Sequence, residues 1–129
     1  MFRACRPFHP ARLHAVLSST ATWEGVGSSV GVLVLATRLH GVVEWRQVGD
    51  VGTVKWGPSD ARARDDERGR WWSELVFAAR PGGGHVDAPR LRGALEAALL
   101  RDEEMVLRTA WGVLEDPFEA WLPREEDDG

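Results

Sequence analysis

The residues of this chain that could ligate a metal ion are four histidines and one cysteine. His9 and His14 are five residues apart, which places them off the shared helical face that an i, i+4 pair of ligands would use. Adding Cys5, His40 and His85 gives no recognisable ligand pattern. The sequence therefore predicts no metal site within the chain, with His9 and Cys5 as the weak candidates.

The glycine-rich stretch RPGGGHVD at residues 80–87 invites comparison with loops that bind phosphate through backbone amides just before a helix. It lacks the lysine and the hydroxyl residue that make such a loop a specific signal, so a flexible connection is the better interpretation. Glu74 and His85 could pair as acid and base, but nothing in their spacing orients them around a nucleophile. We predict that the chain is not an enzyme and uses no cofactor.

Tryptophan is unusually frequent, with seven residues against no tyrosine. Four of them lie in segments predicted to form a sheet: Trp45, Trp56, Trp71 and Trp72. Exposed Trp and Arg residues mark binding hot spots, so we predict that these four residues and Arg46 form a surface for a protein partner, with at least two of the indoles exposed. The alternative is that helices cover the indoles completely and leave a hydrophobic core without a docking patch.

The motif RPFHP at residues 6–10 sets prolines on both sides of an aromatic residue and a histidine. Pro7 donates no ladder hydrogen bond and ends a first strand. Pro10 suits the first position of a helix, which places His9 at the N-cap, and Phe8 can fasten the turn to the core. We therefore interpret Pro7, Phe8, His9 and Pro10 as a structural corner between a strand and a helix.

The composition favours one globular domain, since 129 residues with 43% hydrophobic content can bury a single core. A net charge of −4 and a single lysine, Lys55, argue against a nucleic-acid surface. The longest apolar run, residues 30–36, is too short to cross a membrane. A lone cysteine and an N-terminus without a long apolar core predict a cytoplasmic location.

Hydrophobic periodicity predicts a strand, a helix, several strands and then helices along the chain. Residues 28–38 are apolar on both alternating faces, which predicts a central strand that is covered on both sides. Residues 58–70 mix charges without apolar periodicity and predict an exposed loop. The other predicted elements are a helix over 10–18, a hairpin of 41–48 with 52–57, a strand over 71–79, a helix capped by Asp87 and a short helix capped by Asp102.

This order of elements predicts an α+β fold: a mainly antiparallel sheet of four or five strands with helices on one face. We assign residues 1–122 to one domain. The acidic sequence PREEDDG at residues 123–129 is predicted to be a flexible tail.

Six short motifs, in this order, resemble the C-terminal domain of CobW-like GTPases. They are RPFHPARL at 6–13, LATR at 35–38, WRQVG at 45–49, ELVF at 74–77, LLRDEEM at 99–105 and DPFEAW at 116–121. The resemblance covers nearly the whole chain. It implies a small α+β domain that is normally attached behind a P-loop GTPase domain, in proteins thought to deliver zinc, cobalt or related metals to client proteins.

The chain departs from the family's full-length pattern, because it contains no G-x-x-x-x-G-K-[ST] phosphate loop and no cysteine motif of the GTPase domain. Arg101 also stands where the family commonly has a threonine. The resemblance thus implies a non-catalytic interaction or regulatory module that lacks the GTPase domain. Its expected partner is a CobW-like GTPase domain or a metal-dependent client, with no nucleic acid and no membrane. The alternative is a direct metal-binding or small-ligand-binding protein that uses His9, Cys5 and the tryptophan face.

Overall fold

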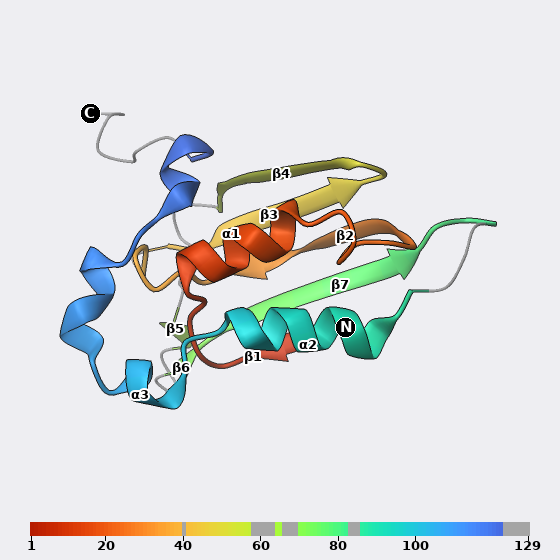
Figure 1. Cartoon of the computed structure of the whole chain (residues 1–129). Helices are drawn as coiled ribbons and strands as arrows, with labels where there is room; N and C mark the ends of the chain where they lie inside the picture. Colours follow the sequence, from red (N-terminus) through yellow and green to blue (C-terminus); the bar gives the residue numbers. More distant parts are fainter. Residues whose placement is uncertain (40, 58–63, 66–69, 83–85, 123–129) are drawn as a thin grey trace.

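A computed structural model describes residues 1–39, 41–57, 64–65, 70–82 and 86–122. A five-stranded antiparallel sheet has the order β1-β7-β2-β3-β4, and helices α1 and α2 lie side by side on one face of it (Figure 1). The predicted α+β fold with helices on one face is confirmed. The sheet strands are β1 (Phe2–Ala4), β2 (Val26–Leu33), β3 (Val43–Val48), β4 (Val51–Trp56) and β7 (Ser73–Ala79).

The two main helices begin and end close to where the sequence predicts. Helix α1 (Pro10–Ser18) starts at an N-cap formed by His9 and buries Leu13 and Leu17 against the sheet. Helix α2 (Ala88–Ala98) starts at Asp87, whose side chain accepts a hydrogen bond from the Arg90 N–H at 3.1 Å. None of the described helices is long and apolar enough to span a bilayer.

The β3–β4 hairpin fixes which side chains face the helices. Its two-residue turn has Gly49 at φ +59° in the first central position, a left-handed conformation that glycine adopts without strain. Alternation along β3 then buries Val43, Trp45 and Gln47 under the helices. We call this side of the sheet the helix face, and the opposite side, which carries Arg46, the open face.

The prediction that the central strand is covered on both sides is wrong. Val30 of β2 is 50% exposed and its neighbour Val76 of β7 is 48% exposed, both on the open face. Only two layers are present in the described part of the chain, so valines that favour strand geometry remain in solvent on the second face.

The segment predicted as an exposed loop, residues 58–70, contains β5 (Arg64–Asp65) and Arg70, the first residue of β6 (Arg70–Trp71), which pairs with β5. The prediction of a loop is wrong for these residues, and the rest of that segment lies outside the described residues. The predicted acidic tail at residues 123–129 also lies outside them.

After α2 the chain forms what we call the C-terminal strap, residues 100–122. It contains α3 (Asp102–Met105) and two 3₁₀ turns, η1 (Arg108–Val113) and η2 (Pro117–Ala120), and it runs along one end of the sheet (Figure 1). Phe118 and Leu122 of the strap are buried in the main core. The strap is therefore part of the folded domain and returns the chain to the side of α1.

Gly31 lies at the centre of β2, and a substitution there tests the close packing of the sheet. A Cβ atom at Gly31 would lie 2.1 Å from the Glu74 carbonyl oxygen of the neighbouring strand. We expect Gly31→Ala to lower the free energy of unfolding, measured by urea denaturation, by about 1–3 kcal/mol. Gly93→Ala in α2, where a Cβ meets nothing within 4 Å, is the control and should raise it by about 0.5–1 kcal/mol. Equal effects of the two substitutions would contradict this packing.

Candidate functional site

The corner at residues 6–10 is inserted beside the end of β2. The Phe8 N–H donates to the Val34 carbonyl at 2.8 Å, and the Phe8 carbonyl accepts from the Ala36 N–H at 3.0 Å. The Phe8 ring is fully buried in the core. Both the backbone and the side chain of Phe8 thus tie the corner to the sheet, as the structural interpretation predicted.

The other side of the corner holds the end of α2. The Leu100 N–H donates to the Pro7 carbonyl at 3.0 Å, and the His9 N–H donates to the Ala98 carbonyl at 2.9 Å. Phe8 and His9 use their N–H groups in backbone hydrogen bonds. Pro7 and Pro10, on either side of them, have no N–H, so neither residue leaves a buried donor without a partner. The two prolines of RPFHP are explained by this arrangement.

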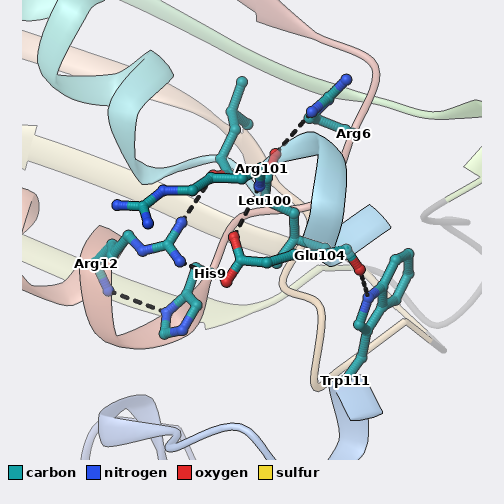
Figure 2. Close-up of polar contacts among 8 residues, drawn as sticks. Arg6, His9, Arg12, Leu100, Arg101, Glu104 and Trp111 are labelled. Atoms are coloured by element: carbon teal, nitrogen blue, oxygen red, sulfur yellow. Dashed lines mark hydrogen bonds and ion pairs between the residues drawn. The ribbon is translucent and has the colours of Figure 1, made fainter. Parts of the chain in front are cut away.

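Glu104 of α3 joins the strap to the corner (Figure 2). Its carboxylate accepts hydrogen bonds from the Arg12 guanidinium and, at 2.8 Å, from the Arg101 backbone N–H. Its backbone carbonyl accepts from the Trp111 indole N–H at 2.8 Å. One residue therefore connects α1, α3 and η1.

Arg6 supports the same contact from the strand side of the corner. Its guanidinium donates to the Leu100 carbonyl at 2.8 Å and to the Asp102 carboxylate at 3.0 Å. Asp102 was predicted to cap α3, and this is wrong by one position: Arg101 occupies the N-cap and Asp102 is the first helical residue. Asp102 lies in the first helical turn, where a negative charge suits the helix dipole.

The charges of the corner shift two pKa values. Burial disfavours the Glu104 carboxylate and raises its pKa, but the hydrogen bonds from Arg12 and from the Arg101 N–H outweigh this and place the pKa below its ordinary value. Partial burial, followed by the charge of Arg12, lowers the pKa of His9. A neutral His9 can accept the long hydrogen bond of 3.4 Å from the Arg12 N–H that caps α1.

A second junction joins the LATR and DPFEAW motifs. The Asp116 carboxylate accepts from the Arg38 guanidinium at 2.8 Å and from the Thr37 hydroxyl at 2.7 Å, and both charged side chains are largely buried. Asp116 also accepts from the Phe118 N–H at 3.0 Å and so caps η2. The Arg38 guanidinium lies over the Trp56 ring, 5.6 Å from its centroid. This junction fixes the strap at its far end.

A buried polar network lies under the helix face of β3. The Trp45 indole N–H donates to the Ser29 hydroxyl at 2.8 Å, and that hydroxyl donates to the Gln47 side-chain oxygen at 2.8 Å. The Gln47 side-chain N–H group donates to the Gly49 carbonyl at 2.6 Å and to the Val26 carbonyl at 3.3 Å. Pairing each of these groups removes the cost of burying them.

Next to this network the helix face of β3 and β4 is hollowed into a cavity of about 1110 Å³, which we call the Trp groove. Trp23, Trp45 and Trp121 line it together with part of β4 and the turn after α1. The Trp23 and Trp45 rings pack at 5.7 Å, and Trp121, which is 40% exposed, lies 4.1 Å from the His14 ring. A concave, partly aromatic surface of this kind suits ligand or peptide binding.

Trp45 and Arg46 of the predicted partner surface lie on opposite faces of the sheet. Trp45 is 4% exposed, because it shares the helix face with Val43 and Gln47, and Arg46 is exposed on the open face. A sheet alternates its side chains, so adjacent residues of one strand cannot form a single patch.

The other three indoles of the predicted surface are half-buried. Trp71 packs edge to face with Trp111 at 5.4 Å, and Trp72 lies 5.4 Å from the Arg3 guanidinium. With Trp56 also half-buried, the prediction that at least two of the four are exposed is wrong. Their assignment to partner binding stays a prediction.

The candidate metal ligands do not gather in the described part of the chain. Cys5 is exposed with a free thiol, His9 caps α1 and His14 lies against the strap. His40 and His85 lie outside the described residues. Within the described ranges no group of three or more His, Cys, Asp or Glu residues could hold a metal ion.

Sequence reasoning missed three residues that shape these sites. The sequence could have indicated Glu104, because a Glu at the third position of a helix often accepts a hydrogen bond from the N-cap N–H. It could not have indicated Trp23 and Trp121, since each reaches the Trp groove only through the tertiary fold.

Residues 1–99 match a known protein family. The cobalamin synthesis protein cobW C-terminal domain family matches residues 1–99. The chain belongs to this family. Membership confirms the resemblance inferred from the six motifs. The whole C-terminal strap, residues 100–122, lies beyond the matched residues.

Two curated relatives of the cobW C-terminal domain match nearly the whole chain. They are zinc chaperone Rv0106 of Mycobacterium tuberculosis (strain ATCC 25618 / H37Rv) and uncharacterized protein Mb0109 of Mycobacterium bovis, each 33% identical over 137 residues. Each match covers 93% of this chain and 34% of the relative, so the chain spans about a third of the length of these relatives. No solved structure matches the chain.

The lowered pKa of Glu104 predicts an acid-sensitive contact. The charged carboxylate stabilises the fold above the unfolded-state pKa, near 4.5, and this contribution is lost as the pH falls through the lower folded-state pKa. At neutral pH, Glu104→Gln should reduce the free energy of unfolding by about 1 kcal/mol, since the pair is a quarter exposed. In strong acid, where Glu104 is protonated, the free energies of unfolding of the variant and of the unmodified protein should become more similar.

Glu103→Gln is the matched control for this experiment, because Glu103 is exposed on the same helix. Urea denaturation at a series of pH values measures both variants. If Glu104→Gln lowers the free energy of unfolding by the same amount at every pH, down to values below the folded-state pKa of Glu104, the charged carboxylate is not the stabilising group and the prediction is wrong.

Proposed function

We propose that this chain is a non-catalytic interaction or regulatory module that acts with a GTP-dependent zinc or cobalt chaperone. Membership of the cobW C-terminal domain family supports the connection to metal chaperones, and so does the relative named as a zinc chaperone. The metal is cargo in this proposal and is carried by the partner. The module acts in the cytoplasm.

The observation that carries the proposal is that residues of the six motifs make contacts within the domain. His9 caps a helix, Glu104 joins α1 to the strap, Asp116 holds Arg38, and Trp45 and Gln47 share a buried network. In these positions the side chains build a scaffold and do not converge on a reacting atom. A scaffold of this kind functions through its surface, which favours a protein partner.

The partner is the GTPase domain of a CobW-like protein or a metal-dependent client. The part of Rv0106 outside the matched third is the available probe, because the relative is about three times as long as the match. We expect calorimetry to show saturable binding between that part and this chain, and no saturable binding of GTP to this chain alone. A P-loop GTPase from outside the family is the negative control. Micromolar GTP binding by this chain would contradict the non-catalytic assignment.

The second candidate function is direct binding of a metal or small ligand, and the volume of the Trp groove favours it. His9 and Cys5 are the candidate metal ligands. If His9 is structural, His9→Ala should reduce the free energy of unfolding by about 0.5–2 kcal/mol through loss of the cap, without changing the zinc content of the purified protein. Cys5→Ser is the matched control. A stable His9→Ala variant that loses bound zinc would favour direct metal binding instead.

A further inference from the structure

Strand β4 forms one edge of the sheet, and within the described ranges no strand pairs with its outer side. All six of its residues pair with β3 in an unbroken register. The opposite edge, β1, has only three residues. Proteins commonly shorten, kink or cover such edges, because an exposed regular edge recruits another strand. A regular β4 edge is therefore a surface that suits strand pairing.

The hydrogen bonds of the hairpin show which backbone groups face outward. The Gly57 N–H donates to the Val42 carbonyl at 2.9 Å, so this pair is a hydrogen-bonded one. Hydrogen-bonded and non-hydrogen-bonded pairs alternate along an antiparallel ladder. The pairs that contain Gly52 and Val54 are consequently non-hydrogen-bonded, and the N–H and C=O groups of these two residues point away from β3.

The same two residues border the Trp groove on the helix face. Gly52 leaves room for the Trp45 ring, since a Cβ atom there would lie 2.4 Å from it. A strand added to β4 would place every second side chain on the helix face, against Trp45, Trp23 and Trp121. The outer side of β4, which is unpaired within the described residues, can supply main-chain hydrogen bonds, and the adjoining groove can select side chains.

On the open face the β4 edge carries one lysine. The Lys55 side chain is 78% exposed, and its ion pair with Glu44 of β3 is long, at 3.8 Å. Arg46, on the neighbouring strand, is exposed on the same face. An incoming strand with carboxylates between its apolar residues would complement this charge, whereas a second copy of β4 would bring the same cations together.

We propose that β4 and the Trp groove bind an extended segment of a partner protein in which apolar and acidic residues alternate. The segment pairs with Gly52 and Val54, places its apolar side chains in the groove and places its acidic side chains beside Lys55. This inference rests on the proposed function, because it names the surface through which the module binds its partner.

The first test uses a fluorescent peptide in which valine and glutamate alternate, long enough to span β4. Val54→Pro removes an outward N–H without removing a ladder bond to β3, so the variant should fold and bind the peptide about tenfold more weakly. Hydrogen exchange should show that the peptide protects the Gly52 and Val54 amides. Unchanged affinity in a folded Val54→Pro variant, or no protection, would overturn the proposal.

The second test reverses one charge and does not alter the backbone. Lys55→Glu should weaken binding of the valine–glutamate peptide about threefold and strengthen binding of a valine–lysine peptide. Arg92→Glu, an equal charge change at an exposed position of α2, should leave both affinities unchanged. Equal effects of the two variants would show that net charge alone governs binding and would overturn the predicted position of the acidic side chains.

The part of Rv0106 outside the match separates this inference from the proposed function. If it binds the unmodified chain and Val54→Pro equally well, the partner exists but does not use the β4 edge. If it does not bind while the peptide does, the edge is a binding site and the proposed partner is wrong. A dimer of this chain in ultracentrifugation that Val54→Pro dissociates would assign the edge to a second copy and overturn the proposal.

Discussion

The backbone hydrogen bonds of the corner are the constraint on which the rest of the structure depends. Phe8 bonds to the end of β2 through both its N–H and its carbonyl, and its neighbours Pro7 and His9 bond to the end of α2. A buried backbone group without a partner costs about 1–3 kcal/mol, so the corner cannot leave this position without losing several such bonds together. The position of α2 relative to the sheet is set here, and the strap starts from the same point.

The strap then carries this constraint to the Trp groove. Glu104 fastens its beginning to α1, Asp116 fastens its far end to Arg38, and Trp121 follows directly as part of the groove. The side chains of the Arg12–Glu104 pair are about a quarter exposed, so this pair positions the strap more than it stabilises the fold. The Arg38–Asp116 pair is largely buried, and removing one partner would leave the other charge buried without its ion pair. These contacts, together with the burial of Phe118 and Leu122 in the core, hold Trp121 beside groove residues that are distant from it in the sequence.

The elements that were predictable from the sequence depend on local chemistry. Proline and the N-cap residue fix the start of α1, and the Gly-Asp pair favours a turn between β3 and β4, so the helix start and the hairpin were readable within a few residues. The second strand of the hairpin begins one residue earlier than predicted. The burial of Trp45 and the exposure of Val30 were not, because they depend on which face of the sheet the helices cover. A valine-rich run predicts a strand, but it does not determine how many layers pack on it.

Residues that build the domain and residues available to a partner are largely different sets in this chain. Phe8, Glu104 and Asp116 belong to three of the six motifs that resemble CobW-like proteins, and they are held in internal contacts. Thr53 and Lys55 of the β4 edge are exposed and belong to none of the six motifs. A domain can retain every internal contact and still change its edge residues, since those side chains support no packing. In this chain the contacts that hold the corner and the strap therefore do not involve the side chains of Thr53 and Lys55, which a partner would meet at the β4 edge.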